Sequence, residues 1–129
     1  MIHVKRAYES VGEMDGKRFL VDRLWPRGLK KTVLQVEGWL KTVAPSDQLR
    51  RWFGHEPSKW EAFQRRYFAE LEAKPEAWEP LRKAAREGDI TLVYSAQDTE
   101  HNNAMGLRLF LIEKLKPRAK AKRRGTVSA

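Results

Sequence analysis

The chain has 129 residues, 41% of them hydrophobic, and this length and composition suit one domain with a single core. It contains no cysteine, which excludes disulfides and a thiol nucleophile, and its three scattered histidines favour no structural zinc site. The net charge of +9 is concentrated in residues 116–129, which hold six basic residues and no acid, so the other 115 residues carry only +3.

The composition also predicts the location and the domain organisation. No apolar run approaches the roughly 20 residues that span a bilayer, and the first residues lack the apolar region of a signal peptide, so we expect a cytoplasmic protein. We expect residues 1–115 to form one domain and residues 116–129 to form a basic, flexible tail. That tail can bind phosphates without sequence preference, or it can be a solvated terminus; its lack of aromatic residues favours the second interpretation.

Three segments have the pattern of strands. Residues 2–8 (IHVKRAY) alternate as a half-buried strand does, and residues 18–25 (RFLVDRLW) begin with a continuous apolar run that is typical of a central strand. The second strand is expected to end near 26–28 (PRG), because proline cannot donate to a ladder. Residues 90–98 (ITLVYSAQD) predict the third strand, whereas residues 29–44 are compatible with a short helix or an extended segment.

The remaining segments have helical patterns. Ser46 and Gly54 have the character of an N-cap and a C-terminal stop around one helix, and Asn102 is the N-cap candidate of the last helix. The helical segments are 44–54, 57–73, 75–89 and 100–117. Strands separated by helices imply crossovers, so the sequence predicts an α/β fold: a small, mostly parallel sheet of about three strands covered by four to five helices.

Polar residues gather where two of the predicted strands end. The second strand ends in Asp22, Arg23, Trp25 and Arg27, and the third ends in Tyr94, Ser95, Gln97 and Asp98, followed by His101 and Asn102. Because ligands of open α/β sheets bind beyond the carboxyl ends of parallel strands, these groups are expected to share one cleft.

The residue types limit the chemistry of this cleft. Arginine pairs bind phosphates or carboxylates, and carboxylates or a histidine can act as general base, so the catalytic candidates are Asp22, Asp98 and His101. The ligand-binding candidates are Arg23, Arg27, Arg50, Tyr94, Ser95 and Asn102. A carboxylate here can also bind a hard metal, but no metal site is predicted and no cofactor is indicated. Ser95 lacks both an adjacent histidine and the glycines of a nucleophile elbow.

Each candidate also has a structural interpretation. Asp22 and Arg23 can form an ion pair that ties the sheet edge to a helix, and Asp98 and Asn102 can cap the last helix. His101 can be an exposed residue of the capping region. The aromatic residues of the middle helices are expected to be core, because helical spacing explains them.

Four motifs in order resemble a known family. VDRLWPRG, WLKTVAPSDQLRRWFGH, KWEAFQRRYFAEL and ITLVYSAQDTEHNNA are similar to the YeaO-like family of uncharacterised bacterial proteins (domain of unknown function 488). The resemblance runs from about Val4 to Leu115 and implies a compact α/β domain in a bacterial, cytoplasmic setting. It implies no reaction, and its recurring polar positions match most of the candidate residues above, whereas Gln97 departs from the family pattern.

Three functions from different classes follow from this sequence. The leading hypothesis is a protein whose polar cleft binds an anionic, phosphate- or nucleotide-like ligand, with hydrolysis among the reactions that the groups permit. The second is a non-enzymatic module that associates with nucleic acid through the basic tail. The third is a structural or partner-binding domain in which the charges are ion pairs. The oligomeric state is not indicated.

Overall fold

The sheet has four parallel strands in the part of the chain that the structure, a computed structural model, describes: residues 1–117. The predicted tail therefore lies, apart from its first two residues, outside the described residues. The strands are β1 (Ile2–Arg6), β2 (Lys17–Leu20), β3 (Gly38–Trp39) and β4 (Ile90–Tyr94), in the order β1-β4-β2-β3. All three strand pairs are parallel, so the predicted fold class is confirmed, with one short strand more than expected.

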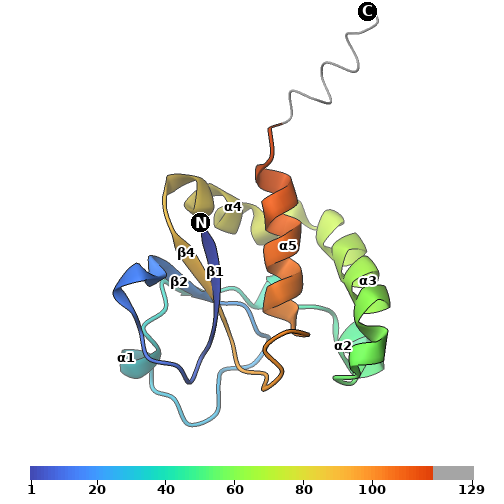
Figure 1. Cartoon of the computed structure of the whole chain (residues 1–129), viewed down its shortest axis with the longest axis horizontal. Helices are drawn as coiled ribbons and strands as arrows, with labels where there is room; N and C mark the ends of the chain where they lie inside the picture. Colours follow the sequence, from blue (N-terminus) through green and yellow to red (C-terminus); the bar gives the residue numbers. More distant parts are fainter. Residues whose placement is uncertain (118–129) are drawn as a thin grey trace, which may run out of the picture.

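Four of the five described α-helices lie on one side of this sheet and α1 lies on the other, as Figure 1 shows. The α-helices are α1 (Lys31–Leu34), α2 (Asp47–Phe53), α3 (Trp60–Glu72), α4 (Pro75–Glu87) and α5 (Asn103–Leu115). Three short 3-10 helices, η1 (Glu13–Asp15), η2 (Lys41–Val43) and η3 (Pro57–Lys59), connect these elements. Within residues 1–117, no helix combines the length and the apolar character that crossing a bilayer requires.

The alternation of side chains along the strands produces two separate cores. Phe19 and Leu92 point to the face that α2–α5 cover, and they belong to the larger core. Leu20 and Val93, each one residue further along, point to the opposite face, where Leu34 of α1 packs against them. Successive strand residues alternate between the faces of a sheet, so both faces of β2 and β4 are apolar and both must be covered.

The second strand ends earlier than predicted. β2 stops at Leu20 rather than near Pro26, and the last backbone hydrogen bond on this side runs from Val21 N to Val93 O at 3.1 Å. One residue later, the side chain of Asp22 takes the place of the backbone by accepting from Ser95 N at 2.9 Å. The hydrogen-bond ladder between β2 and β4 ends here because the Asp22 carboxylate, rather than a backbone carbonyl, accepts from Ser95 N. The residues after Asp22 leave the sheet and form a loop.

The sequence of residues 29–44 is compatible with a short helix or an extended segment, and the structure contains both. α1 occupies its first part, and Gly38 and Trp39 then pair with Phe19 and Leu20 as β3. A strand of two residues is too short for a period of alternation, which explains why the sequence pattern did not predict it.

The predicted caps of two helices are confirmed. Ser46 Oγ accepts from Leu49 N at 3.1 Å, and Gly54 follows α2 in the left-handed conformation with a φ of 53°. Asn102 Oδ1 accepts from Met105 N at 2.9 Å at the start of α5. Each side chain satisfies a backbone N–H that the first turn of a helix leaves without a partner.

Gly16 allows a close approach that positions the start of β2. It has a φ of +64°, and a Cβ at this residue would collide with the carbonyl oxygen of Asp89. That carbonyl accepts from Lys17 N at 3.1 Å and so joins β2 to the residue before β4. Only glycine combines this φ with this contact without strain.

We expect Gly16→Ala to lower the free energy of unfolding by more than about 2 kcal/mol, because it adds a steric collision to an unfavourable φ. Gly28→Ala is the matched control: Gly28 has a φ of +82°, but nothing lies within 4 Å of its added Cβ. The control is expected to cost about 1 kcal/mol from backbone strain alone. Urea denaturation of the two variants measures the difference, and equal losses would contradict the role of the Asp89 contact.

Candidate functional site

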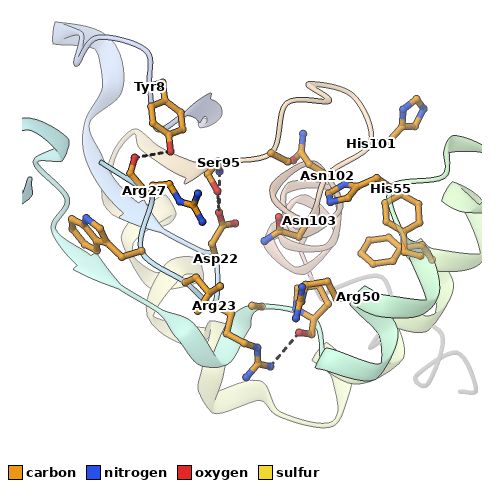
Figure 2. Close-up of a pocket in the computed structure, with 17 residues that line it drawn as sticks. Tyr8, Asp22, Arg23, Arg27, Arg50, His55, Ser95, His101, Asn102 and Asn103 are labelled. Carbon is orange, nitrogen blue, oxygen red and sulfur yellow. Dashed lines mark hydrogen bonds between the residues drawn. The ribbon is translucent and has the colours of Figure 1, made fainter. Parts of the chain in front are cut away.

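The carboxyl ends of β2 and β4 lie at one edge of the sheet and border a pocket of about 390 Å³. The two strands pair in parallel, with Leu20 opposite Val93, so the expectation that the two polar strand ends meet is confirmed. Figure 2 shows the polar side chains that line this pocket, which come from the ends of β2 and β4, from α2 and the start of α5, and from Tyr8 after β1 and His55 after the C-cap of α2. Elements far apart in the sequence therefore build the pocket together.

Asp22 and Ser95 form the bridge between the two strand ends. One carboxylate oxygen, Oδ2 of Asp22, accepts from Ser95 N at 2.9 Å and from Ser95 Oγ at 2.8 Å. Burial raises the pKa of Asp22, while the hydrogen bonds from Ser95 and the Asn103 amide oppose that rise. Asp22 is thus not paired with Arg23, as the ion-pair interpretation predicted, but with the other strand end.

Two of the three arginines of the pocket share one carboxylate. Arg23 Nε lies 3.1 Å from Asp47 Oδ1, and Arg23 Nη2 donates to Pro45 O at 3.2 Å. Arg50 Nη2 lies 3.3 Å from the same Asp47 oxygen, one turn along α2. Arg23 therefore does tie the sheet edge to a helix, but through Asp47 rather than Asp22.

Arg27 differs from the other two arginines. Its guanidinium lines the pocket but makes no hydrogen bond or ion pair with any residue of 1–117. Its backbone carbonyl accepts from Tyr8 Oη at 3.0 Å, a contact drawn in Figure 2, so the backbone is held while the charged end is unpaired. This leaves a cation in the pocket that the protein does not neutralise.

Asp98 and Tyr94 are not brought to the pocket. Asp98 accepts from the backbone N–H of Glu100 and of His101, and these bonds, together with one to the His101 imidazole, lower its pKa. Tyr94 is 2% exposed and packs within the larger core. The structure thus places Asp98 in the loop before α5, where it holds the backbone of Glu100 and His101 while Asn102 caps the helix. Tyr94 lies in the core.

His101 and Asn102 line the pocket but are held by local contacts. Asn102 uses both ends of its amide, because Oδ1 caps α5 and Nδ2 donates to Asp98 O at 2.9 Å. His101 Nδ1 lies 3.0 Å from Asp98 Oδ2, and its ring meets Trp60 edge-on with centroids 5.4 Å apart. Asn102 is therefore mainly structural, whereas His101 is oriented by Asp98 at the margin of the pocket.

Sequence reasoning missed several residues that line the pocket. Tyr8 follows the end of β1, which is also parallel, so the rule about strand ends would have found it. His55, like His101, has the sequence position of an exposed residue next to a helix cap; it follows the C-cap of α2 with a positive φ of 59° and lines the pocket. Phe53 and Phe63, predicted to be core, are core residues that also form the apolar wall of the pocket.

No metal centre accompanies this pocket within residues 1–117, where no group of three or more histidine, cysteine, aspartate or glutamate side chains gathers closely enough to hold an ion. The pocket offers three guanidinium groups, two imidazoles and the carboxylate of Asp22. This set is suited to an anionic ligand rather than to a cation.

We expect the raised pKa of Asp22 to make the folded state less stable as the pH rises. Above the usual value of 3.8, the folded state retains a proton that the unfolded state has lost, so its stability falls until the folded pKa is passed. Asp22→Asn abolishes this titration and keeps an acceptor for Ser95 N, whereas Asp22→Ala removes the acceptor and is expected to cost about 1–3 kcal/mol.

Chemical denaturation between about pH 4 and pH 7 measures this effect as the difference between wild type and Asp22→Asn. Asp15 and Asp98 have lowered pKa values and favour the opposite trend, but they are common to both proteins and cancel in the difference. A difference that does not change with pH would contradict the assignment.

Comparison with known proteins agrees with the resemblance seen in the motifs. A model described as the inactive DUF488-N3 subclade matches residues 1–128. The uncharacterized protein YeaO of Escherichia coli (strain K12) is 42% identical over 106 residues, which cover 82% of this chain and 92% of that protein. The uncharacterized protein Rv3073c of Mycobacterium tuberculosis (strain H37Rv) is 37% identical over 110 residues, covering 85% and 92%. No solved structure matches the chain significantly. The chain therefore belongs to the DUF488 family, within the subclade described as inactive DUF488-N3.

Proposed function

We propose that the pocket at the strand ends binds a phosphorylated small molecule and that the protein acts by binding it rather than by transforming it. The observation that carries this proposal is the unpaired guanidinium of Arg27 in the pocket. Arg27 is exposed, so its charge needs no partner for stability, and its place in the lining of the pocket leaves its donors available to an anionic ligand.

The charge balance of the pocket supports an anionic ligand. Arg23, Arg27 and Arg50 line it, whereas Asp22 is the only carboxylate among the residues of 1–117 that line it. Oδ2 of Asp22 already accepts two hydrogen bonds from Ser95, and desolvation disfavours its ionised form. The arginines therefore dominate the local potential, and their forked donors match the oxygens of a phosphate.

The size and the walls of the pocket support a ligand with an organic part. About 390 Å³ lies within the usual range of about 300–1,000 Å³ for small-molecule sites. Trp25, Phe53 and Phe63 provide aromatic surface beside the arginines. A phosphate attached to a flat or apolar group, as in a nucleotide, can use both kinds of wall.

Two observations favour binding over catalysis. The matching subclade is described as inactive, and the chain shares that family assignment along nearly its whole length. The hydroxyl of Ser95 donates to Asp22 and forms no hydrogen bond with a histidine of the described chain, so a serine–histidine pair is not assembled. Asp22, Asp98 and His101 therefore enter the proposal as positioning groups of a binding site rather than as a catalytic set.

We expect a nucleoside monophosphate, such as thymidine 5′-monophosphate, to raise the melting temperature of the wild type. A ligand at one hundred times its dissociation constant stabilises the folded state by about 2.7 kcal/mol. Arg27→Ala is expected to weaken binding about tenfold without loss of stability, because the Arg27 side chain forms no hydrogen bond or ion pair with the described residues. Thermal shift and isothermal titration calorimetry measure both effects.

Arg86→Ala is the matched control, because Arg86 is an exposed arginine in the last turn of α4 and does not line the pocket. Arg23→Ala is a poorer test, since it also breaks the contacts with Asp47 and Pro45. If the phosphate compound stabilises wild type and Arg27→Ala equally, or stabilises neither, the proposal is wrong.

A further inference from the structure

A second hollow of about 410 Å³, more open than the first, adjoins the pocket. It lies between η2 and the start of α4, and its lining is Arg23, Lys41, Thr42, Lys74, Glu76 and Ala77. Arg23 lines both hollows, so one guanidinium stands at the boundary between them.

The two lysines of this second hollow are held by neutral groups. Lys74 Nζ donates to Thr42 O at 2.6 Å, with Ala44 O at 3.4 Å, and Lys41 Nζ lies 4.2 Å from the ring centroid of Trp39. Neither lysine forms an ion pair with a carboxylate of residues 1–117. Their charges are positioned but not neutralised.

Two further observations define the electrostatics of the second hollow. Glu76 is the only acid that the described part of the chain contributes to its lining, so the three cationic side chains outweigh it. Arg23 is pinned by Asp47 and Pro45, and its side chain is still 41% exposed, which leaves donors that can face a ligand. Arg27 thus lines the first pocket, Lys41 lines the second hollow, and Arg23 lines both.

We propose that the ligand carries two phosphate groups, one in the pocket and the second in the hollow lined by Lys41 and Lys74. The inference rests on the proposed function and extends it from one anionic group to two. Arg23 is the shared contact that joins the two positions. A free bisphosphorylated metabolite and the phosphorylated end of a nucleic-acid strand both have this chemistry, and the experiment below separates them.

The test compares three probes: thymidine 5′-monophosphate, the 5′-phosphorylated dinucleotide pTpT, and fructose 1,6-bisphosphate. We expect at least one of the two-phosphate probes to bind wild type about three- to tenfold more tightly than the monophosphate, because exposed ion pairs contribute modestly. Tighter binding of pTpT alone would assign a nucleic-acid end, and tighter binding of the sugar bisphosphate alone would assign a metabolite.

The variants separate the second hollow from the pocket. Lys41→Gln is expected to weaken the preferred two-phosphate probe about three- to fivefold and to leave the monophosphate unchanged. Glu76→Gln is expected to strengthen the same probe, because it removes the only acid of the hollow. The side chains of Lys41 and Glu76 are exposed, and neither makes a hydrogen bond within the described chain, so both variants are expected to fold. Lys83→Gln, at an exposed position of α4, is the control.

Two results would overturn the inference, and only one of them would also overturn the proposed function. If the monophosphate binds wild type and the two-phosphate probes bind no tighter, or if Lys41→Gln and Glu76→Gln change nothing, only the second phosphate position is wrong. If no probe binds wild type, the proposed function fails together with it.

Discussion

The hydrogen bonds from Ser95 to Asp22 connect the two central strands at the point where their backbones part. The ladder between β2 and β4 ends with Val21 N donating to Val93 O at 3.1 Å, and the next bond is made by a side chain. Because the carboxylate satisfies Ser95 N, the chain after Asp22 is free to leave the sheet without leaving a buried N–H unpaired. The pocket exists because that chain turns outward and forms one of its walls.

The residue that joins the two strand ends, Asp22, is an acid, and it therefore affects the charge of the pocket. A backbone carbonyl could have accepted from Ser95 N without burying a charged group. Burial of Asp22 instead disfavours its charged form and raises its pKa. The remaining charged groups of the lining are arginines, and Asp47 compensates two of them from outside the pocket. The Arg27 side chain has no partner among the described residues, so the arginines of the lining outnumber the acids that pair with them.

A second polar cluster lies on the α1 side of the sheet, and there the charged side chains pair with one another. Asp15 Oδ2 lies 2.7 Å from Arg18 Nη1, and Asp15 Oδ1 lies 2.9 Å from Lys5 Nζ. Burial alone would raise the pKa of Asp15, but the hydrogen bonds from Gly12, Lys5 and Arg18 outweigh it and lower the pKa. Every charge of this cluster is paired, which is the usual condition for buried charges in a stable fold. Arg27 differs from these residues because its side chain is exposed and has no partner among the described residues, so its donors are available to an anion.

The sequence by itself determined the α/β class, the long helices with their caps at Ser46 and Asn102, and the gathering of polar residues after two strands, because each of these depends on local periodicity or on adjacent residues. It did not determine which charges pair. Asp22 is bound by Ser95, 73 positions away in the sequence, and Arg23 by Asp47. Only the tertiary structure decided that the Arg27 side chain stays unpaired among the described residues, since a side chain's partner depends on distances in space that no local pattern contains.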